Sequence, residues 1–367
     1  MRIVVFGLTV SSSWGNGHAT LWRGLCRAFA RRGHHVVFFE RDVPYYAANR
    51  DLHELPGGRL VLYRAWQDVR RNAEREIAAA DTAIVTSYCP DAITATDLVL
   101  QAPRALRVFY DLDTPVTLSR LKAGQRPDYL GPDGLSGFDL VLSYTGGSAL
   151  DGLARDLGAR QVAPLYGHVD PDMHRPAVPD PAFDAALSYL GTYAEDRQPA
   201  LERLLVEPAR SRPAAPFLIG GAQYPREFPW AENIRFVSHV PPADHPAFFS
   251  SCRMTLNVTR RDMAAMGWCP SGRLFEAAAC GAPVLSDIWE GLDAFFTPGE
   301  EIVVAERTED TLSALDLTDG DLKRIAKRAR ERVLAEHTSE RRAAEFEHLV
   351  GGARPPVRAP ALAHARG

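Results

Sequence analysis

Short apolar runs alternate with helical stretches from the start of the chain. Residues 2–9 are predicted to form a buried strand, and residues 18–32 a helix in which Leu21, Leu25 and Phe29 recur every four positions on one face. Further strands are predicted at 36–39, 59–63, 82–86, 105–110 and 138–143. Because these runs are apolar on both faces and alternate with helices, they indicate a parallel sheet covered by helices.

A proline-rich, acidic stretch separates this series from a second one. Residues 169–183 contain DPDMHRPAVPDP, which disfavours helix and interior strand, so we predict a linker there. Beyond it, strands are predicted near 186–190, 217–219, 234–237, 254–257, 283–286 and 302–304. At 367 residues the chain exceeds the usual size of one hydrophobic core. We therefore expect two α/β domains, at 1–168 and 184–337, and a flexible tail at 351–367.

Composition and charge exclude several classes of protein. The chain is 46% hydrophobic and 24% charged, which is typical of a globular protein. A net charge of -4 gives no electrostatic argument for a nucleic-acid partner, and no stretch approaches the ~20 apolar residues of a membrane span. The five cysteines show no CxxC pair and no zinc-like spacing. Their odd number argues against a disulfide framework, so we expect a reducing, cytoplasmic location.

The loop SSSWGNGHAT, residues 11–20, follows the first predicted strand. Ligands of open parallel sheets bind beyond the carboxyl ends of the strands, so such loops are where functional residues are expected. Gly15 and Gly17 allow close backbone approach, and the helix start offers free N–H groups. His18 is predicted either to accept a proton from a reacting hydroxyl or simply to cap the loop. The predicted substrate-binding residues here are Ser13, Trp14, Asn16 and Gly17.

Two further loops carry weaker signals. Asp111-Leu112-Asp113 superficially matches a metal-binding DxD motif. In a chain with two Rossmann-like halves, however, we interpret Asp113 as a cleft carboxylate that binds substrate. Asp111 is assigned to substrate binding, and no metal is predicted. The alternative is that Asp113 caps the helix that follows. In YTGGSAL, residues 144–150, Tyr144 and Gly146 precede another helix start and are also assigned to substrate.

The strongest signal lies at residues 257–287. Pro270 and Ser271 mark a helix start, Arg273 lies in its first turn, and Glu276 follows one turn later on the same face. A nucleotide diphosphate would rest on Ser271, Gly272 and Arg273, while the Glu276 carboxylate accepts the ribose hydroxyls. The alternative is an Arg–Glu pair on an ordinary surface helix.

A dehydrogenase is disfavoured. Glu40 ends the second predicted strand, where an acidic residue would bind the ribose of NAD, but Gly15 comes too late after the first strand and position 20 is Thr20. Glu40 is therefore expected to be a surface carboxylate at a strand end.

The segment GRLFEAAACGAPVLSD resembles the nucleotide-sugar-binding segment of GT-B glycosyltransferases. Its extension, LNVTRRDMAAMGW with DIWEGLDAFFTPGEEIVVA, is similar to the spore-maturation, CgeB-like family of that superfamily, as are SSSWGNGHATLWRGL, YDLDTPVTL, LSYTGG and LGTYAEDRQPALERLL. The resemblance runs to about residue 305. It implies a GT-B fold: α/β, with two facing Rossmann-like domains with parallel sheets, substrates meeting in the cleft, and a helix at 338–350 that crosses back to the first domain.

The resemblance also implies roles for individual residues. Arg197 would hold the diphosphate and Glu276 the ribose. The loop with Ser238, His239 and Val240 would frame the base beside Gly221. One position departs: Trp268 stands where the larger retaining group has a glutamate that touches the donor sugar.

The sequence thus predicts a glycosyltransferase that moves a sugar from a nucleotide-diphosphate donor, with UDP-sugars favoured, to a hydroxyl of unidentified acceptor. His18 and Asp113 are its catalytic candidates, no metal or other cofactor is expected, and the resemblance favours retention at the anomeric carbon. The alternatives are a nucleotide-sugar epimerase of the same fold, a non-catalytic surface or assembly protein, and a metal-dependent DxD transferase.

Overall fold

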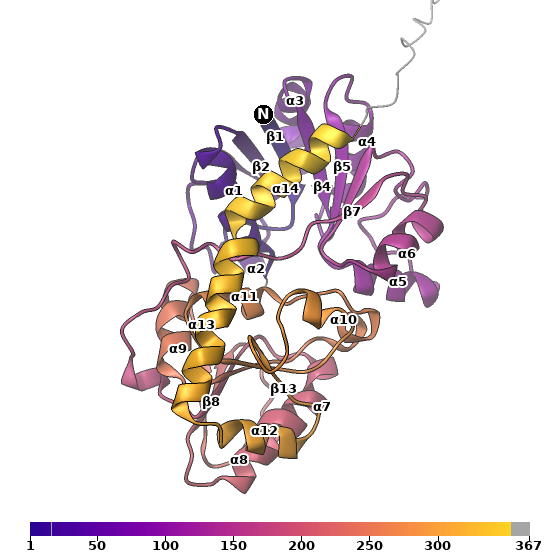
Figure 1. Cartoon of the computed structure of the whole chain (residues 1–367). Coiled ribbons are helices and arrows are strands. Elements are labelled where there is room, and N and C mark those ends of the chain that lie inside the picture. The colour runs from indigo at the N-terminus through magenta and orange to yellow at the C-terminus, as the bar shows by residue number, and fades with distance from the viewer. Residues whose placement is uncertain (16, 354–367) are drawn as a thin grey trace, which may run out of the picture.

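The computed structural model describes residues 1–15 and 17–353 and has two α/β lobes, one above the other (Figure 1). Each lobe is built on one sheet in which every strand pairing is parallel. The first sheet has the order β3-β2-β1-β4-β5-β6-β7 and the second β10-β9-β8-β11-β12-β13. The direction in which strands are added reverses after β1 in the first sheet and after β8 in the second. The loops that follow the strands on the two sides of such a point leave a crevice between them.

The elements of the first lobe match most of the predicted runs. Its strands are β1 (Arg2–Gly7), β2 (His35–Arg41), β3 (Gly58–Tyr63), β4 (Thr82–Thr86), β5 (Leu106–Asp111), β6 (Leu140–Ser143) and β7 (Val162–Pro164). Its helices are α1 (His18–Arg31), α2 (Pro44–Ala47), α3 (Trp66–Ala78), α4 (Ala92–Leu100), α5 (Thr114–Lys122) and α6 (Ser148–Leu157). The helix predicted at 18–32 is confirmed, and β7 is an additional strand.

The second lobe also follows the predicted series. Its strands are β8 (Leu187–Leu190), β9 (Phe217–Gly221), β10 (Ile234–Ser238), β11 (Thr255–Asn257), β12 (Val284–Ser286) and β13 (Val303–Val304). Its α-helices are α7 (Gln198–Leu201), α8 (Glu207–Ser211), α9 (His245–Ser251), α10 (Arg261–Met266), α11 (Gly272–Ala279), α12 (Thr308–Leu315) and α13 (Asp319–Glu336), and α14 (Ser339–Gly352) follows. Short helical turns are η1 (Pro181–Phe183), η2 (Glu195–Arg197), η3 (Glu202–Val206), η4 (Pro242–Asp244) and η5 (Leu292–Ala294).

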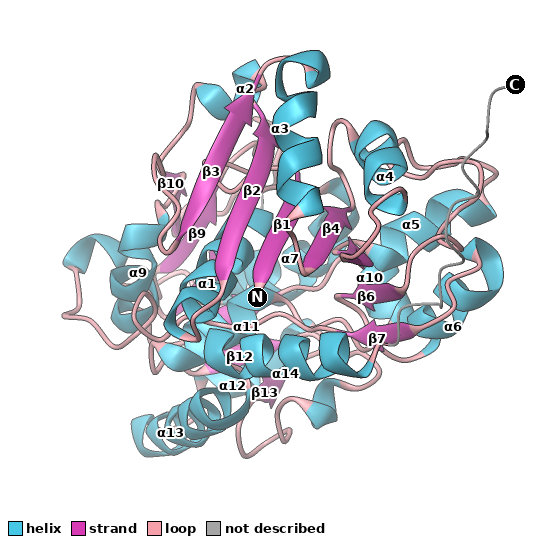
Figure 2. Cartoon of the chain, turned by 90° about the horizontal axis from the view of Figure 1, so that it is seen from above, coloured by secondary structure: helices cyan, strands magenta, loops and turns pink. Residues whose placement is uncertain are grey.

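Alternation along the central strands fills both faces of the first sheet. Val4 and Phe6 of β1 pack with α3 and α4 on one face, whereas Ile3 and Val5 pack with α1 and α14 on the other. Figure 2, which looks down on this lobe, shows the strands lying between these helices. This two-faced burial explains why the strands are apolar throughout instead of alternating with polar residues.

The C-terminal helices connect the two lobes. In Figure 1, α13 runs up the lower lobe and α14 continues onto the upper one, where it packs on α1. The Phe29 and Phe346 rings, from α1 and α14, meet with centroids 5.0 Å apart. The chain between the sheets crosses beside this junction, because Val169 N donates to His337 O and Ser339 N donates to Val169 O. This is the segment in which the resemblance implies a crossing helix.

The first residues of the predicted tail belong to α14. Gly351 and Gly352 end α14, and Ala353, which caps it, is buried. The rest of the predicted tail, 354–367, lies outside the described residues. Among the helices that the structure describes, none is long and apolar enough to cross a bilayer.

Candidate functional site

A cavity of about 670 Å³ lies between the carboxyl ends of the two sheets. The first lobe contributes the loops after β1, β5 and β6, and the second lobe contributes the loops after β8, β9, β10 and β11 together with the start of α11. Most residues predicted from the sequence line it: Ser13, Gly17, His18, Asp113, Tyr144, Arg197, Gly221, His239, Val240, Ser271, Gly272, Arg273 and Glu276.

Three of the predicted residues that the structure describes do not line the cavity. Trp14 is beside the cavity, with its ring against His239 at 4.5 Å between centroids. Asp111 is fully buried beneath it, and Gly146 is held by its N–H bond to Trp268 O at 2.9 Å. The substrate-binding assignments of Asp111 and Gly146 are therefore not supported by their positions. Asn16 lies outside the described residues.

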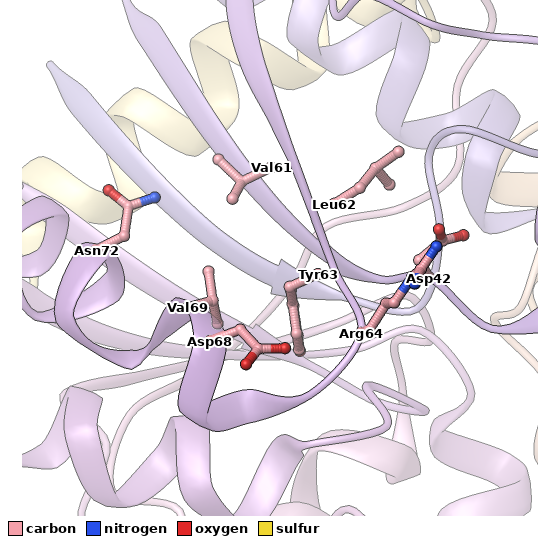
Figure 3. A pocket seen from close by; sticks show the side chains of 8 residues that line it. All are labelled: Asp42, Val61, Leu62, Tyr63, Arg64, Asp68, Val69 and Asn72. Carbon is pink, nitrogen blue, oxygen red and sulfur yellow. The ribbon is translucent and has the colours of Figure 1, made fainter.

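A second hollow, of about 400 Å³, lies at the edge of the first sheet beside β3 and α3 (Figure 3). Its carboxylates are already engaged: Asp42 pairs with Arg50 at 2.6 Å, and Asp68 accepts a hydrogen bond from Ala65 N at the start of α3. This hollow offers no converging set of free polar groups, so we place the candidate site in the cavity between the sheets.

Two guanidinium groups stand on the second-lobe side of the cavity. Arg273 lies in the first turn of α11, where its guanidinium stacks over the Tyr189 ring at 4.9 Å and donates to Asn257 Oδ1 at 3.2 Å. Burial lowers its pKa below the ordinary value, but arginine remains charged at neutral pH. Arg197 donates to Thr192 O at 3.3 Å, and its Nε is buried without a partner.

These cations have no acidic partner within the part of the chain that the structure describes. Gly191 lets Arg273 come close, because a Cβ there would lie 2.6 Å from Arg273 Nη2. Together with the free N–H groups at the start of α11, the two guanidiniums form a positive, partly desolvated surface. Such a surface favours an anion with several oxygens, such as a diphosphate.

Glu276 lies one turn after Arg273, as predicted. Its carboxylate accepts no hydrogen bond from the described residues, and two histidines stand near it. His174 Nε2 is 4.0 Å from Glu276 Oε1, and His245 Nδ1 is 3.9 Å from Glu276 Oε2. Burial lowers the pKa of both imidazoles to about 4, so they are neutral at pH 7. The carboxylate is thus free to accept hydrogen bonds from vicinal hydroxyls.

The loop after β10 forms the far wall on this side. His239 N donates to Gly221 O at 2.8 Å, which brings the ends of β9 and β10 together. His239 has φ 56°, a left-handed conformation that costs a non-glycine residue energy. Tyr88 and Gln223, with φ 59° and 66°, also line the cavity. Strained backbone therefore gathers at the cavity, as it does at functional sites.

On the first-lobe side, His18 and Asp113 form a pair. His18 is the first residue of α1, and Asp113 occupies the N-cap position of α5 without a side-chain cap hydrogen bond. His18 Nε2 lies 3.0 Å from Asp113 Oδ2. Ser87 Oγ donates to the same oxygen at 3.3 Å. The structure thus brings together two residues 95 positions apart that the sequence singled out separately. His18 Nε2 is thus held by the carboxylate, while His18 Nδ1 is buried without a partner among the described residues. A carboxylate paired with an imidazole at a cleft is a typical arrangement for handling a substrate proton.

Asp111 supports this pair from below. Its Oδ1 accepts the Asp113 N–H at 3.0 Å, and its Oδ2 is buried without a partner. Burial, and then the nearby Asp113 charge, raises the pKa of Asp111 to about 6. Its role in the structure is to hold the Asp113 backbone.

The interpretation of Glu40 as a surface carboxylate is wrong. Glu40 is fully buried and accepts hydrogen bonds from Thr9 Oγ1 at 2.9 Å, Val10 N at 2.7 Å, Ser11 N at 2.9 Å and Ser11 Oγ. The loop after β1 folds over the end of β2 and directs its donors at this carboxylate. Glu40 therefore fixes the start of the loop that carries His18.

Sequence reasoning missed four residues of the site: Tyr189, Asn257, His174 and His245. Tyr189 and Asn257 lie within predicted strands, where an aromatic and a polar residue at a strand end give only a weak signal. His174 falls in the predicted linker, and His245 opens a short helix. Their meeting with Glu276 depends on tertiary packing.

Comparison with known proteins fits this geometry. A family model described as "Glycosyl transferase-like" matches residues 197–348, which include Arg197, Arg273 and Glu276. The search of curated proteins finds no match. A sucrose-phosphate synthase from Thermosynechococcus elongatus is 16% identical, with 95% of this chain and 98% of that chain covered and a TM-score of 0.70.

Two further solved structures superimpose over nearly the whole chain. HepE of Anabaena, in complex with UDP and glucose, is 10% identical, covers 96% of this chain and 99% of that one, and has a TM-score of 0.69. An alpha-glucosyltransferase in complex with UDP is 12% identical, covers 96% and 100%, and has a TM-score of 0.70. The chain has the GT-B fold. In GT-B terms, the cavity described above is the cleft between the two Rossmann-like lobes.

Proposed function

We propose that the protein is a glycosyltransferase that moves a sugar from a nucleotide-diphosphate donor to an acceptor hydroxyl. The observation that carries the proposal is the donor side of the cleft. Among the described residues, Arg197 and Arg273 have no acidic partner, and the Glu276 carboxylate, one turn along α11, accepts no hydrogen bond. This spacing matches a diphosphate followed by a ribose. The match of residues 197–348 to a glycosyltransferase-like family supports it. The finer assignment to the CgeB-like family rests on sequence resemblance.

The donor is proposed to be a UDP-sugar. The diphosphate would lie on the start of α11 between the two guanidiniums, the ribose on Glu276, and the base beside Gly221, His239 and Val240. The preference for UDP draws on structural neighbours that hold UDP or UDP-glucose, although one neighbour, a starch synthase, holds ADP. Charge that develops on the leaving diphosphate would be stabilised by fixed guanidiniums and N–H dipoles, so the proposed mechanism uses no Mg²⁺.

The acceptor hydroxyl is proposed to bind at the His18–Asp113 pair. In a retaining transfer, which the sequence resemblance favours, the pair holds the hydroxyl on the face of the anomeric carbon that the diphosphate leaves, and the departing diphosphate takes the hydroxyl proton. In an inverting transfer His18 also takes the hydroxyl proton. NMR of the product distinguishes the two, because the coupling constant of the anomeric proton reports its configuration.

The direct test is a binding screen on the full chain with UDP, GDP, ADP and dTDP, followed by the sugar nucleotides of the base that binds. A ligand at a hundred times its dissociation constant stabilises the fold by about 2.7 kcal/mol, which thermal unfolding detects readily. We expect UDP to stabilise the wild type and not the Glu276→Ala variant. If no nucleotide diphosphate changes the unfolding temperature, the proposal is wrong.

The same sugar nucleotide separates transfer from epimerisation. Incubated without acceptor, an epimerase would convert the donor to its epimer, whereas a transferase would leave the sugar configuration unchanged and release UDP slowly to water. A chain that binds UDP but does neither with any acceptor would favour the non-catalytic alternative.

A further inference from the structure

His174, His245 and Glu276 form a compact group at the wall of the cleft. His174 lies in the connection between the two sheets, His245 is the first residue of α9, and Glu276 lies on α11. One ligand atom from each lies within 4.8 Å of the other two. Within residues 1–15 and 17–353, this is the one group of three or more His, Cys, Asp or Glu side chains with that geometry.

The atoms that face one another are mostly acceptors. His245 Nε2 donates to Val240 O at 3.2 Å, so His245 Nδ1 presents its lone pair to the group. His174 Nε2 is 3.5 Å from that nitrogen, which allows at most one long hydrogen bond. The Glu276 carboxylate receives no hydrogen bond from the described residues. A nitrogen lone pair and a carboxylate held this close repel each other, and a cation bound between them would remove that repulsion.

The separations suit one metal ion. Zinc binds histidine nitrogen at about 2.0–2.1 Å and carboxylate oxygen at about 2.0–2.2 Å, so two ligands of a tetrahedral zinc lie roughly 3.3–3.5 Å apart. The two imidazole nitrogens are already 3.5 Å apart. Each lies 3.9–4.0 Å from its nearer carboxylate oxygen, so Glu276 needs only a small side-chain rotation. Val240 O, by fixing the His245 ring, serves as the outer support that such ligands usually have.

The donor set also selects the kind of metal. Two imidazoles and one carboxylate suit zinc and similar transition metals, whereas Mg²⁺ and Ca²⁺ prefer all-oxygen sites. Glu276 and His245 line the cavity, while the His174 side chain is only 3% exposed. A bound ion would therefore have its fourth position open to the cleft.

We propose that His174, His245 and Glu276 bind a divalent transition-metal ion, best matched by zinc, and that this ion blocks donor binding. The blocking half rests on the proposed function, because it needs Glu276 to be the ribose acceptor. A carboxylate oxygen that ligates zinc does not accept the ribose hydroxyls. The ion lies on the ribose side of the donor and takes no part in the transfer.

Metal binding is tested on the full chain without nucleotide, by calorimetric titration with Zn²⁺ and separately with Mg²⁺. We expect one saturable zinc site in the micromolar range or tighter, no magnesium binding, and at least tenfold weaker zinc binding in His174→Gln. His53→Gln, which changes an exposed histidine away from the cleft, is the matched control and should bind zinc like the wild type.

Equal zinc affinity in His174→Gln and wild type would overturn the site, as would the absence of a saturable site in the wild type. Thermal unfolding without metal checks that His174→Gln is folded, and His245→Gln serves as the second variant if it is not. Co²⁺ supplies an independent readout, because tetrahedral coordination gives strong visible absorption that both variants should lose.

Competition is tested by titrating UDP at fixed zinc concentrations. The apparent dissociation constant of UDP should rise more steeply with zinc in the wild type and in His53→Gln than in His174→Gln. Chelation of zinc by UDP in solution affects all three proteins equally and is corrected by the comparison. If zinc binds but the zinc-dependent rise is the same in all three proteins, the proposal that zinc blocks donor binding is wrong. If UDP binds none of the three proteins, the proposed function is wrong, whereas the result of the zinc titration remains valid.

Discussion

The cleft has a first wall, formed by the first lobe, and a second wall, formed by the second lobe, and the two differ in how their charged groups are paired. On the first-lobe wall, two carboxylates have partners inside the protein: Asp113 faces His18, and Glu40 is surrounded by hydrogen-bond donors. On the second-lobe wall, Arg197 and Arg273 have no acidic partner in the described chain and are held by a backbone carbonyl, an amide oxygen and an aromatic ring. The first wall fits a neutral hydroxyl, whereas the second wall fits an anion.

This difference has an energetic consequence. A desolvated cation without a counter-charge costs stability, so the second wall is maintained at the expense of the ligand-free fold. A diphosphate that supplies the missing charge recovers that cost on binding. Donor binding should therefore depend mainly on the second wall, and the rate of transfer mainly on the first.

The largest expected effect comes from His18→Ala. Removing the imidazole takes away the group that holds the acceptor hydroxyl, so kcat/KM should fall about 10²-fold if His18 only positions it and up to about 10⁴-fold if His18 also takes its proton. The dissociation constant of UDP should not change, because that ligand binds the other wall. Steady-state kinetics and calorimetry measure the two quantities on the same sample.

His35→Ala, at the exposed start of β2, is the matched control and should keep wild-type kinetics. Asp113→Asn should lie between the two, since it leaves the imidazole but weakens its orientation. A kcat/KM within threefold of wild type for His18→Ala would mean that the first wall has only a structural role.

Arg273→Ala should weaken donor binding, which His18→Ala should leave unchanged. We expect UDP binding to weaken strongly and kcat/KM to fall about 10²–10³-fold, because the guanidinium stabilises the charge of the leaving group. Arg273→Lys should recover only part of the loss, since an ammonium does not reproduce the bidentate geometry. Arg70→Ala on α3 is the control. Unchanged UDP affinity in Arg273→Ala would refute the assignment of the second wall to the donor.

Many of the residues on both walls could be predicted from the sequence. The strands were visible because buried parallel strands are apolar on both faces, and the Arg273–Glu276 spacing is local to one helix, so one turn of α-helix fixes its geometry. His18 and Asp113 were each identified because each lies at the start of the helix that follows a strand. Their pairing was not predicted, since 95 residues separate them and only the order of strands β1, β4 and β5 brings the loops together.

The wrong interpretation of Glu40 and the omission of His174 share one cause. Glu40 was interpreted by its place at a strand end, but its burial depends on how the loop after β1 folds over it. His174 was passed over because a proline-rich connection gives no sign that it packs against α9 and α11. Local patterns specify helices, strands and caps; burial and ligand groups that converge from three elements depend on the packing of the whole chain.

Asp111 is the exception on the first wall, because its buried carboxyl has an oxygen, Oδ2, without a hydrogen-bond donor among the described residues, and a change of pH should reveal this. Its pKa is raised from the ordinary 3.8 to about 6, so the folded state binds its proton more tightly than the unfolded state does. The stability from this group is complete below pH 4 and is lost as pH rises through 6. Asp111→Asn avoids the loss and should be more stable than wild type by about 1–3 kcal/mol at pH 7–8, with no difference near pH 4. Denaturant unfolding at both pH values measures this; a difference that does not vary with pH would contradict it.

The smallest expected effect concerns an aromatic contact between the two walls. Trp14, from the loop after β1, lies against His239, from the loop after β10, and Gln223 Nε2 donates to Tyr45 OH at 3.1 Å nearby. Aromatic pairs of this kind contribute about 0.5–1.5 kcal/mol. Trp14→Ala should therefore favour an open cleft and raise the donor KM about two- to tenfold, with kcat nearly unchanged at saturation. Tyr45→Phe removes only the second contact and serves as the comparison.

A double-mutant cycle with His239→Ala shows whether the ring contact itself is responsible. If it is, the effects of Trp14→Ala and His239→Ala on donor KM should be less than additive, because either change alone removes the pair. Additive effects would mean that each residue binds donor separately, and Trp14 would then belong to the donor wall despite its place in the first lobe. That outcome would move the boundary between the two walls without changing the charge difference that separates them.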